Sequence, residues 1–424
     1  TPKPSSAASD VYKRQILDPS STFHSTKQDL LIKDGEIANI SKHINDTDNV
    51  KVIEHNNLHV SRGWFDSGVS FGEPGYEERE TLENGLLVAA SSGFTKILLN
   101  PDIIPIPDSN ATISHLIKMG QNKTTSLYPI GALTEKGEGK QLASLYDMHQ
   151  QGAIGFGDYK SSSISGNLLK IALQYAQSFD GTIFSHPMNH EIAEYGMMHE
   201  GIISAKIGVK GIPTIAETIQ ISRDLQILSY TEGKLHIPFI SSKEGLELIR
   251  IAKKQGLNIS CSVGLPNLIF DETDLEGFDV NFKVFPPIRS KTDQQALRSG
   301  LLDGTIDMVS SMHEPMNIEH KKLEFEHSSP GTIGLESCFG LLSNIFPLDK
   351  VLSFLTRGIE CFKLQSSSIE KGKTADLTWF DPEKIFRLER YDLKSTAKNC
   401  AYLDLDLQGK VLGTFNNGFL TTNT

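Results

Sequence analysis

The sequence has few cysteines, no excess of positive charge and no long apolar run. Each of these absences argues against a class of protein. The 424 residues carry 52 acidic and 41 basic side chains, a formal net charge of -11, and no Lys/Arg-rich run. Binding to nucleic acid or to an anionic membrane is therefore not expected. No apolar stretch approaches the roughly 20 residues that a membrane-spanning helix needs.

The cysteines show neither a Cys-x-x-Cys zinc pattern nor a disulfide framework, since they are few and widely spaced. They are Cys261, Cys338, Cys361 and Cys400. The simplest interpretation is a set of reduced thiols in a cytoplasmic protein.

The first fifteen residues, TPKPSSAASDVYKRQ, differ in character from the rest of the chain. They lack the apolar core of a secretory signal, and a strand-like pattern begins only at Ile16. We interpret residues 1–15 as a non-native or disordered extension and leave them out of the fold prediction.

Both ends of the remaining chain are rich in strand patterns. Residues 29–40, DLLIKDGEIANI, predict two strands joined by a tight turn at Asp34-Gly35. Similar patterns return in ADLTWFDPEKIF and GKVLGTFNNGFL near the C terminus. Because chain termini often lie close together, residues 16–60 and 370–424 predict one small composite β-domain.

Residues 61–369 alternate strand patterns with helical patterns such as NLLKIALQYAQSF and KEGLELIRIAKKQ. The strand candidates are HVSRGWFDSGV (which begins just before this range), GFTKILLN, TSLYPIGAL, GAIGFGDY, GTIFSHP, KLHIPFIS, NISCSVGL and DMVSSMHEP. Eight such alternations predict an α/β fold with a parallel sheet closed as a (β/α)₈ TIM-type barrel. An open doubly wound sheet is the alternative, but no Gly-x-Gly-x-x-Gly turn follows the first strand.

Motifs along the chain carry a family resemblance. They are FDSGVSFGEPGYEERETLENG, NPDIIPIPDS, GIPTIAETIQISRDL, KVFPPIRS, LLDGTIDMVSS, GTIGLES and KGKTADLTWFDP. In order and spacing they resemble the dihydroorotases of the cyclic amidohydrolase superfamily, over almost the whole chain. The resemblance implies an amidohydrolase barrel in which zinc activates a water molecule for hydrolysis of a cyclic amide.

Most positions where this family holds zinc or moves the catalytic proton carry unsuitable residues here. The first-strand His-x-His, the sixth-strand histidine and the eighth-strand aspartate correspond to Gly68, Ser70, Phe239 and Met312. Asp158 on the fourth strand and His186 on the fifth remain as candidate metal ligands. Because catalytic zinc needs three protein ligands, we expect no cofactor. Zinc would be expected only if the chain were an active hydrolase.

The positions where the family grips its substrate are replaced as well. The carboxylate-binding arginine corresponds to Gly72, and an asparagine corresponds to Asp102. A second asparagine corresponds to Phe285, and a histidine corresponds to Met316. None of these can replace the forked donor that arginine offers to a carboxylate.

Three other polar groupings are possible sites. Four residues could form an oxygen-rich site for Mg²⁺ or Mn²⁺, namely Asp66, Asp102, Asp158 and His186. His313 and Glu314 could act as a replacement acid–base pair, but neighbouring residues on a strand point to opposite faces. His190 could join His186 on one helical face, although Pro187 argues against a regular helix there.

The sequence thus predicts a dihydroorotase-like protein of pyrimidine biosynthesis that is catalytically impaired, similar to the non-catalytic members of the family. Those members associate with aspartate transcarbamoylase, so the resemblance implies that enzyme as a partner, and a homo-oligomer is also expected. The alternative is an active dihydroorotase, or a hydrolase of another cyclic amide, with an atypical site.

Overall fold

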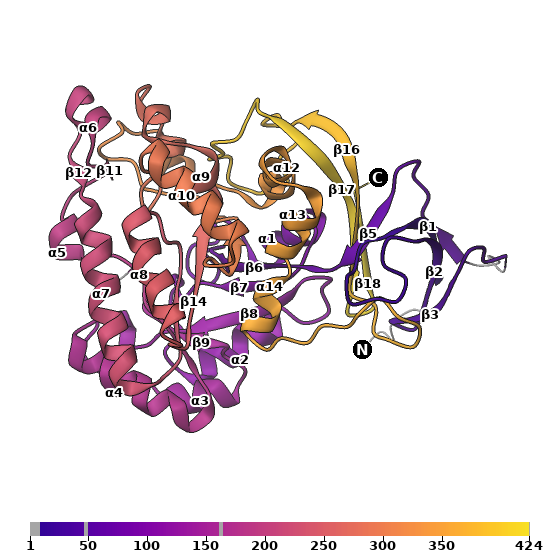
Figure 1. The fold of residues 1–424 in the computed structure, drawn as a ribbon, viewed down its shortest axis with the longest axis horizontal. Helices are drawn as coiled ribbons and strands as arrows, with labels where there is room; N and C mark the ends of the chain where they lie inside the picture. Colours follow the sequence, from indigo (N-terminus) through magenta and orange to yellow (C-terminus); the bar gives the residue numbers. More distant parts are fainter. Residues whose placement is uncertain (1–8, 46–49, 161–163, 424) are drawn as a thin grey trace.

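The computed structural model describes residues 9–45, 50–160 and 164–423. It consists of a helix-covered barrel and a β-domain at one side of it (Figure 1). In that view the earliest and latest parts of the chain, indigo and yellow, lie together in the β-domain, while the middle of the chain forms the barrel.

The barrel has eight parallel strands in simple sequential order. They are β6 (Trp64–Val69), β7 (Phe94–Leu99), β8 (Ser126–Gly131), β9 (Gly155–Phe156), β10 (Thr182–Phe184), β13 (Leu235–Ile237), β14 (Ile259–Gly264) and β15 (Met308–Ser310). Each one falls within a strand candidate of the sequence, so the α/β barrel prediction is confirmed. A hydrogen bond joins the first strand to the last: the Ser310 hydroxyl donates to the backbone carbonyl of Gly68 at 2.9 Å.

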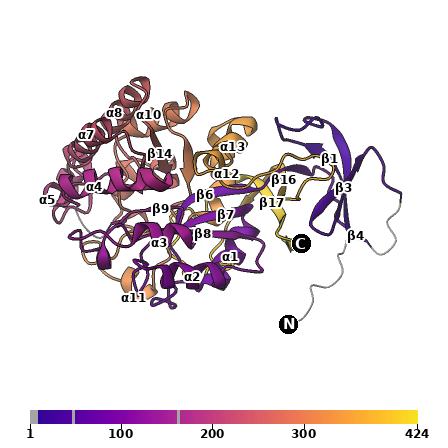
Figure 2. The same cartoon turned by 90° about the horizontal axis from the view of Figure 1, so that it is seen from below.

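Helices pack outside the strands, as the second view shows (Figure 2). The longer ones are α1 (Leu82–Ser91), α2 (Asn110–Met119), α4 (Gly166–Ala176), α7 (Thr214–Thr231), α8 (Lys243–Lys254), α10 (Lys291–Leu302) and α12 (Leu335–Ile345). The shorter ones are α3 (Leu145–Gln150), α5 (His190–Ala193), α6 (Ile202–Ile207), α9 (Leu265–Ile269), α11 (Ile318–Lys321), α13 (Leu348–Phe354) and α14 (Arg357–Cys361). Helix α8 illustrates the principle: the Ser242 hydroxyl caps its N terminus, and Leu246, Ile249 and Ala252 bury one face.

The β-domain is one sheet built from both ends of the chain, in the order β18-β17-β16-β5-β1-β2-β3, with β4 paired to β1. Its strands are β1 (Ser9–Ile16), β2 (Lys27–Lys33), β3 (Glu36–Ser41), β4 (Val50–Val52), β5 (His59–Arg62), β16 (Leu377–Arg387), β17 (Asp406–Asn416) and β18 (Phe419–Thr422). The predicted Asp34-Gly35 turn has φ of 52° and 81°, the left-handed geometry of a tight hairpin.

The N-terminal boundary differs from the sequence interpretation. Residues 9–15, set apart there from the fold, belong to β1, whose backbone pairs with β2, β4 and β5. Strand pairing uses backbone N–H and C=O groups, which every residue except proline has in full. The side-chain composition of this stretch therefore did not reveal that it pairs as a strand. The first eight residues lie outside the described part.

Two further features were not predicted. A two-stranded unit, β11 (Met198–His199) with β12 (Gly211–Ile212), projects before α7. The connection from β16 to β17, residues 388–405, returns to the barrel, where Asn399 binds the backbone of Met316 and Glu314.

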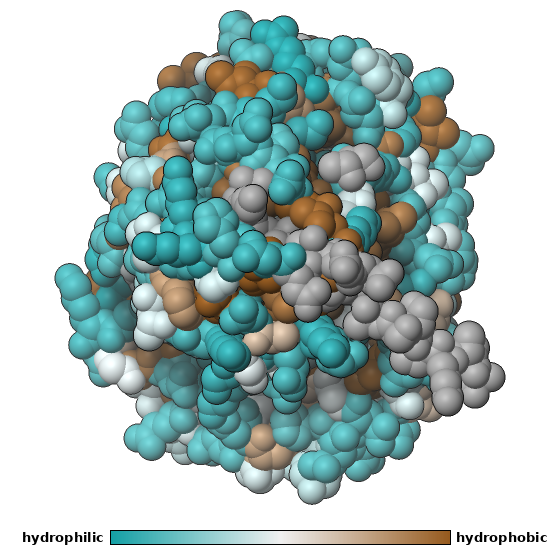
Figure 3. Space-filling view, turned by 90° about the vertical axis from the view of Figure 1, so that its right-hand side faces the viewer, coloured by the Kyte–Doolittle hydropathy of each residue, from teal (hydrophilic) through white to brown (hydrophobic). Residues whose placement is uncertain are grey.

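The surface and the cysteines carry less information. On the face that carries the β-domain, hydrophobic residues form small patches among hydrophilic ones (Figure 3). All four cysteines are free thiols. Within the described residues no helix is long and apolar enough to cross a membrane.

Candidate functional site

The C-terminal ends of the barrel strands, where barrel enzymes carry their chemistry, are almost filled by side chains. Two cavities there each measure about 10 Å³, and both are lined by Tyr159, Phe184 and His186. That is about the space of one water molecule, whereas small-molecule sites usually measure about 300–1,000 Å³. Neither of these two cavities therefore has room for a ligand of ordinary size.

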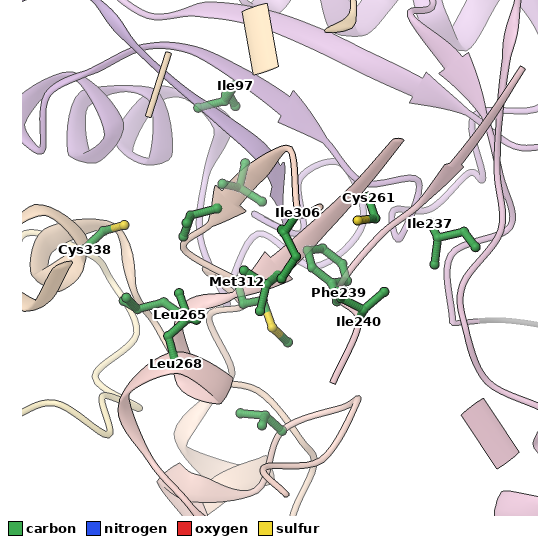
Figure 4. Packing of buried hydrophobic residues seen from close by; sticks show 14 of the residues in the cluster. Ile97, Ile237, Phe239, Ile240, Cys261, Leu265, Leu268, Ile306, Met312 and Cys338 are labelled. Atoms are coloured by element: carbon green, nitrogen blue, oxygen red, sulfur yellow. The ribbon is translucent and has the colours of Figure 1, made fainter. Parts of the chain in front are cut away.

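Phe239 is the main filling residue. It follows β13, is 1% exposed, and belongs to the same hydrophobic cluster as Met312, Ile240 and Leu265 (Figure 4). A Cβ placed on Gly68 would lie 2.7 Å from Cζ of the Phe239 ring. The ring thus occupies the space into which a side chain at Gly68 would project.

Met312 plays a similar part after the last barrel strand. It is 4% exposed, and its Sδ occupies the space that a Cβ on Gly264 would need. A thioether has no acidic proton, so this position cannot relay one. The eighth strand end is closed by a hydrophobic contact.

Three residues at these strand ends share a backbone conformation that side chains rarely adopt. Tyr159, Phe239 and Met312 have φ of 53°, 56° and 48°. A left-handed residue other than glycine costs on the order of 1–3 kcal/mol, and such residues gather at functional sites. The barrel mouth therefore keeps a strained backbone although its side chains are apolar or aromatic.

The carboxylates of the site are largely engaged with the protein itself. Asp158 accepts hydrogen bonds from the backbone N–H groups of Leu133 and Thr134, both at 2.9 Å. Asp66 accepts from Gly68 N at 3.1 Å and from Ser310 Oγ at 2.8 Å. Both side chains thus hold loops at the strand ends.

His186 has no such partners. Neither ring nitrogen forms a hydrogen bond within the described residues, and the ring stacks on Phe285 with centroids 5.4 Å apart. Burial, followed by the charges of Lys160 and His190, lowers the pKa of His186 well below its usual value. The imidazole is therefore neutral at physiological pH.

These residues do not fit the zinc of related barrels. Phe239 fills the space beside Gly68, Asp158 is held by a loop, and His186 stands alone. Throughout the described ranges no three His, Cys, Asp or Glu side chains form a group that could hold a metal. The four residues of the Mg²⁺ or Mn²⁺ hypothesis likewise form no such group among the described residues.

The four substrate positions are equally altered. A Cβ on Gly72, where φ is 107°, would lie 2.7 Å from the carbonyl oxygen of Tyr76. An arginine would therefore not fit this backbone. Phe285 stacks against His186, and Met316 is buried beside the connection from β16 to β17.

Asp102 is the one candidate whose electrostatics stand out. Its Oδ1 is buried without a hydrogen-bond partner in the described structure. Burial and then the charge of Glu314 raise its pKa to about 6, while Ser70 and Lys160 act the other way. The dihydroorotases that the sequence resembles have a neutral asparagine at this position, so Asp102 places an ionisable carboxyl group where they have none.

An ion pair at the mouth was missed by the sequence analysis. Lys160 Nζ lies 2.7 Å from Glu314 Oε2, and both side chains are mostly buried. The two residues are 154 positions apart, so no local pattern links them. His313 points elsewhere, against Phe71 and the start of α12, which confirms that His313 and Glu314 cannot share one pocket.

Comparison with known proteins identifies the family. Residues 60–245 match the profile of the family described as "Dihydro-orotase-like". A protein named dihydroorotase from Syntrophotalea carbinolica is 32% identical over 414 residues, which is 96% of this chain and 97% of the relative. Another from Bacillus cytotoxicus is 32% identical over 92% of this chain and 93% of the relative. The chain belongs to the dihydroorotase family.

Solved structures agree on the fold. The L-hydantoinase (dihydropyrimidinase) from Arthrobacter aurescens superposes with a TM-score of 0.83 at 21% identity, over 98% of this chain and 96% of that one. A dihydropyrimidinase from Brevibacillus agri gives 0.81 at 17% identity, over 98% and 95%. At such identities the similarity concerns the barrel and the added β-domain rather than the chemistry.

Proposed function

We propose that this chain is a non-catalytic member of the dihydroorotase family that serves as a structural or regulatory partner in pyrimidine biosynthesis. One observation carries the proposal: the Phe239 ring fills the space that a ligand side chain at Gly68 would need. Water activation, proton relay and the carboxylate grip all lack their residues, and losing such groups typically costs several orders of magnitude in rate.

Turnover and metal content together test this proposal. Purified protein supplied with zinc should hold no binuclear zinc centre and should hydrolyse dihydroorotate negligibly. His186→Ala should change neither result. Two bound zinc ions, or zinc-dependent turnover at ordinary enzymatic rates that His186→Ala abolishes, would overturn the proposal.

The partner that we propose is aspartate transcarbamoylase from the same organism. The barrel and the β-domain are intact although side chains fill the barrel mouth. A protein without catalytic activity would keep this fold if another part of its surface had a role. A specific complex should bury on the order of 1,600 Å². Co-purification from the native source and light scattering of the mixed proteins test it. If the mixture at micromolar concentrations shows only the separate masses of the two proteins, the proposed partner is wrong and a homo-oligomer without it is the remaining expectation.

The names of the relatives favour a second function, hydrolysis of a cyclic amide at an atypical site. Asp102, with a pKa of about 6, is suited to general base catalysis, and the Lys160–Glu314 pair lies close to it. This function predicts turnover of dihydroorotate, a hydantoin or a dihydropyrimidine, to be measured with and without added zinc. Asp102→Asn should abolish that turnover, whereas Asp406→Asn on the exposed surface should not.

A further inference from the structure

A cavity of about 380 Å³ lies at the edge of the barrel mouth, and Met316, one of the four substrate positions, is among its lining residues. Its walls come from the loop after β14, the loop after β15 and the connection from β16 to β17. Residues from these three segments are Asn281, Asn317 and Lys398 respectively. The volume falls within the range of small-molecule sites, unlike the two cavities at the mouth.

The lining of this cleft is basic, although the protein as a whole carries a net charge of -11. Its cationic residues are Lys321, Lys322, Arg390 and Lys398, and its one acidic residue is Glu78. A concave site of one charge sign concentrates ligands of the opposite sign.

Two of these cations are fixed by backbone carbonyls rather than by carboxylates. Lys321 Nζ donates to the carbonyls of Val280, Ser329 and Gly331, at 2.6 to 3.0 Å. Lys398 Nζ donates to the carbonyls of Leu393 and Ser395. Carbonyl dipoles orient an ammonium group but leave its net charge in place. Burial lowers the pKa of Lys321 to about 8, which still leaves it mostly charged at neutral pH.

The other two cations are available to a ligand. The side chains of Lys322 and Arg390 are exposed, and neither forms an ion pair with any described residue. Arginine offers two parallel N–H donors that match the oxygens of a phosphate or a carboxylate. The side-chain amides of Asn281 and Asn317 line the same space and can add neutral donors.

We propose that this cleft binds a small oxyanion, a metabolite that carries phosphate or carboxylate groups, with Lys322 and Arg390 as its direct contacts. The loops after the seventh and eighth strands of such barrels frequently form phosphate sites, which agrees with this location. The site shares Met316 but not Gly72, Asp102 or Phe285 with the four substrate positions, and its proposed contacts do not depend on whether the mouth hydrolyses a substrate. Because its walls join the barrel to the connection between β16 and β17, an occupant also stabilises the folded protein.

Calorimetric titration at low ionic strength tests the proposal, with sodium pyrophosphate in one arm and citrate in the other. The variant carries Lys322→Glu and Arg390→Glu. The matched control carries Lys254→Glu and Lys384→Glu, which change the net charge equally at exposed positions outside the cleft. We expect at least one anion to bind, and affinity to fall by at least about tenfold in the variant only.

The two arms identify the source of the oxygens. Pyrophosphate binding alone assigns a phosphorylated ligand, and citrate binding alone assigns a polycarboxylate. Binding of neither anion at 10 mM, taken as about the weakest useful affinity, would overturn the site. Equal weakening in the variant and the control would overturn it too, because it would show only a general charge effect. Thermal unfolding of both charge variants without ligand checks that they remain folded.

Discussion

Two buried polar regions lie at the same end of the barrel, and they differ in how well their groups are satisfied. In the first, Glu217 of α7 accepts hydrogen bonds from the backbone and side chains of Ser241 and Ser242, and pairs with Arg289 at 3.3 Å. Both charged side chains are fully buried. In the second, the barrel mouth, His186 and Asp102 keep buried atoms without partners.

This difference indicates that the groups around Glu217 stabilise the fold, whereas those at the barrel mouth do not. Buried polar groups of a stable fold are nearly always paired, as they are around Glu217. Unpaired buried groups beside a strained backbone mark a place shaped by something other than stability. At the mouth, Phe239, Met312 and Phe285 surround the unpartnered polar atoms of His186 and Asp102. The apolar side chains stabilise the fold by packing, whereas the unpartnered polar atoms lower its stability.

Breaking the first region should have the largest effect. Glu217→Ala leaves the Arg289 guanidinium buried and unpaired, so the free energy of unfolding should fall by about 3–5 kcal/mol. Urea denaturation followed by circular dichroism measures it. Asp406→Ala, in the exposed pair with Arg387, is the control and should leave stability almost unchanged. A loss below about 1 kcal/mol for Glu217→Ala would remove the distinction between the two regions.

The mouth should respond to crowding instead. Gly68→Ala drives a Cβ into the Phe239 ring and should cost about 1–3 kcal/mol. Phe239→Ala alone opens a cavity and should cost about 3–5 kcal/mol. The double variant should be less destabilised than the sum by about 1 kcal/mol or more, because the new methyl enters vacated space. Strict additivity in denaturation experiments would show that the ring does not fill the space beside Gly68.

Much of this fold was readable from the sequence. The eight barrel strands are short apolar runs, and the terminal hairpins carry turn residues such as Asp34-Gly35, so local patterns locate them. The pair β11 and β12 has two residues in each strand, too few for any periodic signal. Strand β1 has a composition unlike that of the other strands, and its backbone pairing with β2, β4 and β5 leaves no pattern in the sequence.

The site was readable only in part. The resemblance gave the identity of each replaced residue, from Gly68 to Met316, but not what fills the vacated space. That Phe239 lies against Gly68, or that Lys160 meets Glu314, depends on side chains from different strand ends. The loop contacts of Asp158 and the isolation of His186 likewise follow from three-dimensional placement.

The charge at Asp102 gives a smaller, pH-dependent effect. Its folded pKa, about 6, lies above the unfolded value of about 3.9, so the folded state binds the proton more tightly. Stability from this group is present below about pH 4 and is lost as the pH rises to about 6. Asp102→Asn should therefore raise the free energy of unfolding by roughly 1–2 kcal/mol at pH 7.5 and by little at pH 4. Denaturation at both pH values checks it, and an equal gain at both would contradict the titration.

The smallest expected effect concerns His186. His186→Phe removes two buried nitrogens that lack partners and places an apolar ring beside Phe285, next to two small cavities. The variant should be more stable by about 1 kcal/mol at pH 7.5. Its advantage should grow as the pH falls through about 6.5, because the wild-type histidine takes up a proton more readily once unfolded. His236→Phe is the matched control, since His236 is also buried but its Nδ1 lies 2.8 Å from Ser260 Oγ, so that variant should be destabilised. If both variants lose stability in denaturation experiments, His186 has a partner in solution, and the barrel mouth binds something that its closed geometry does not reveal.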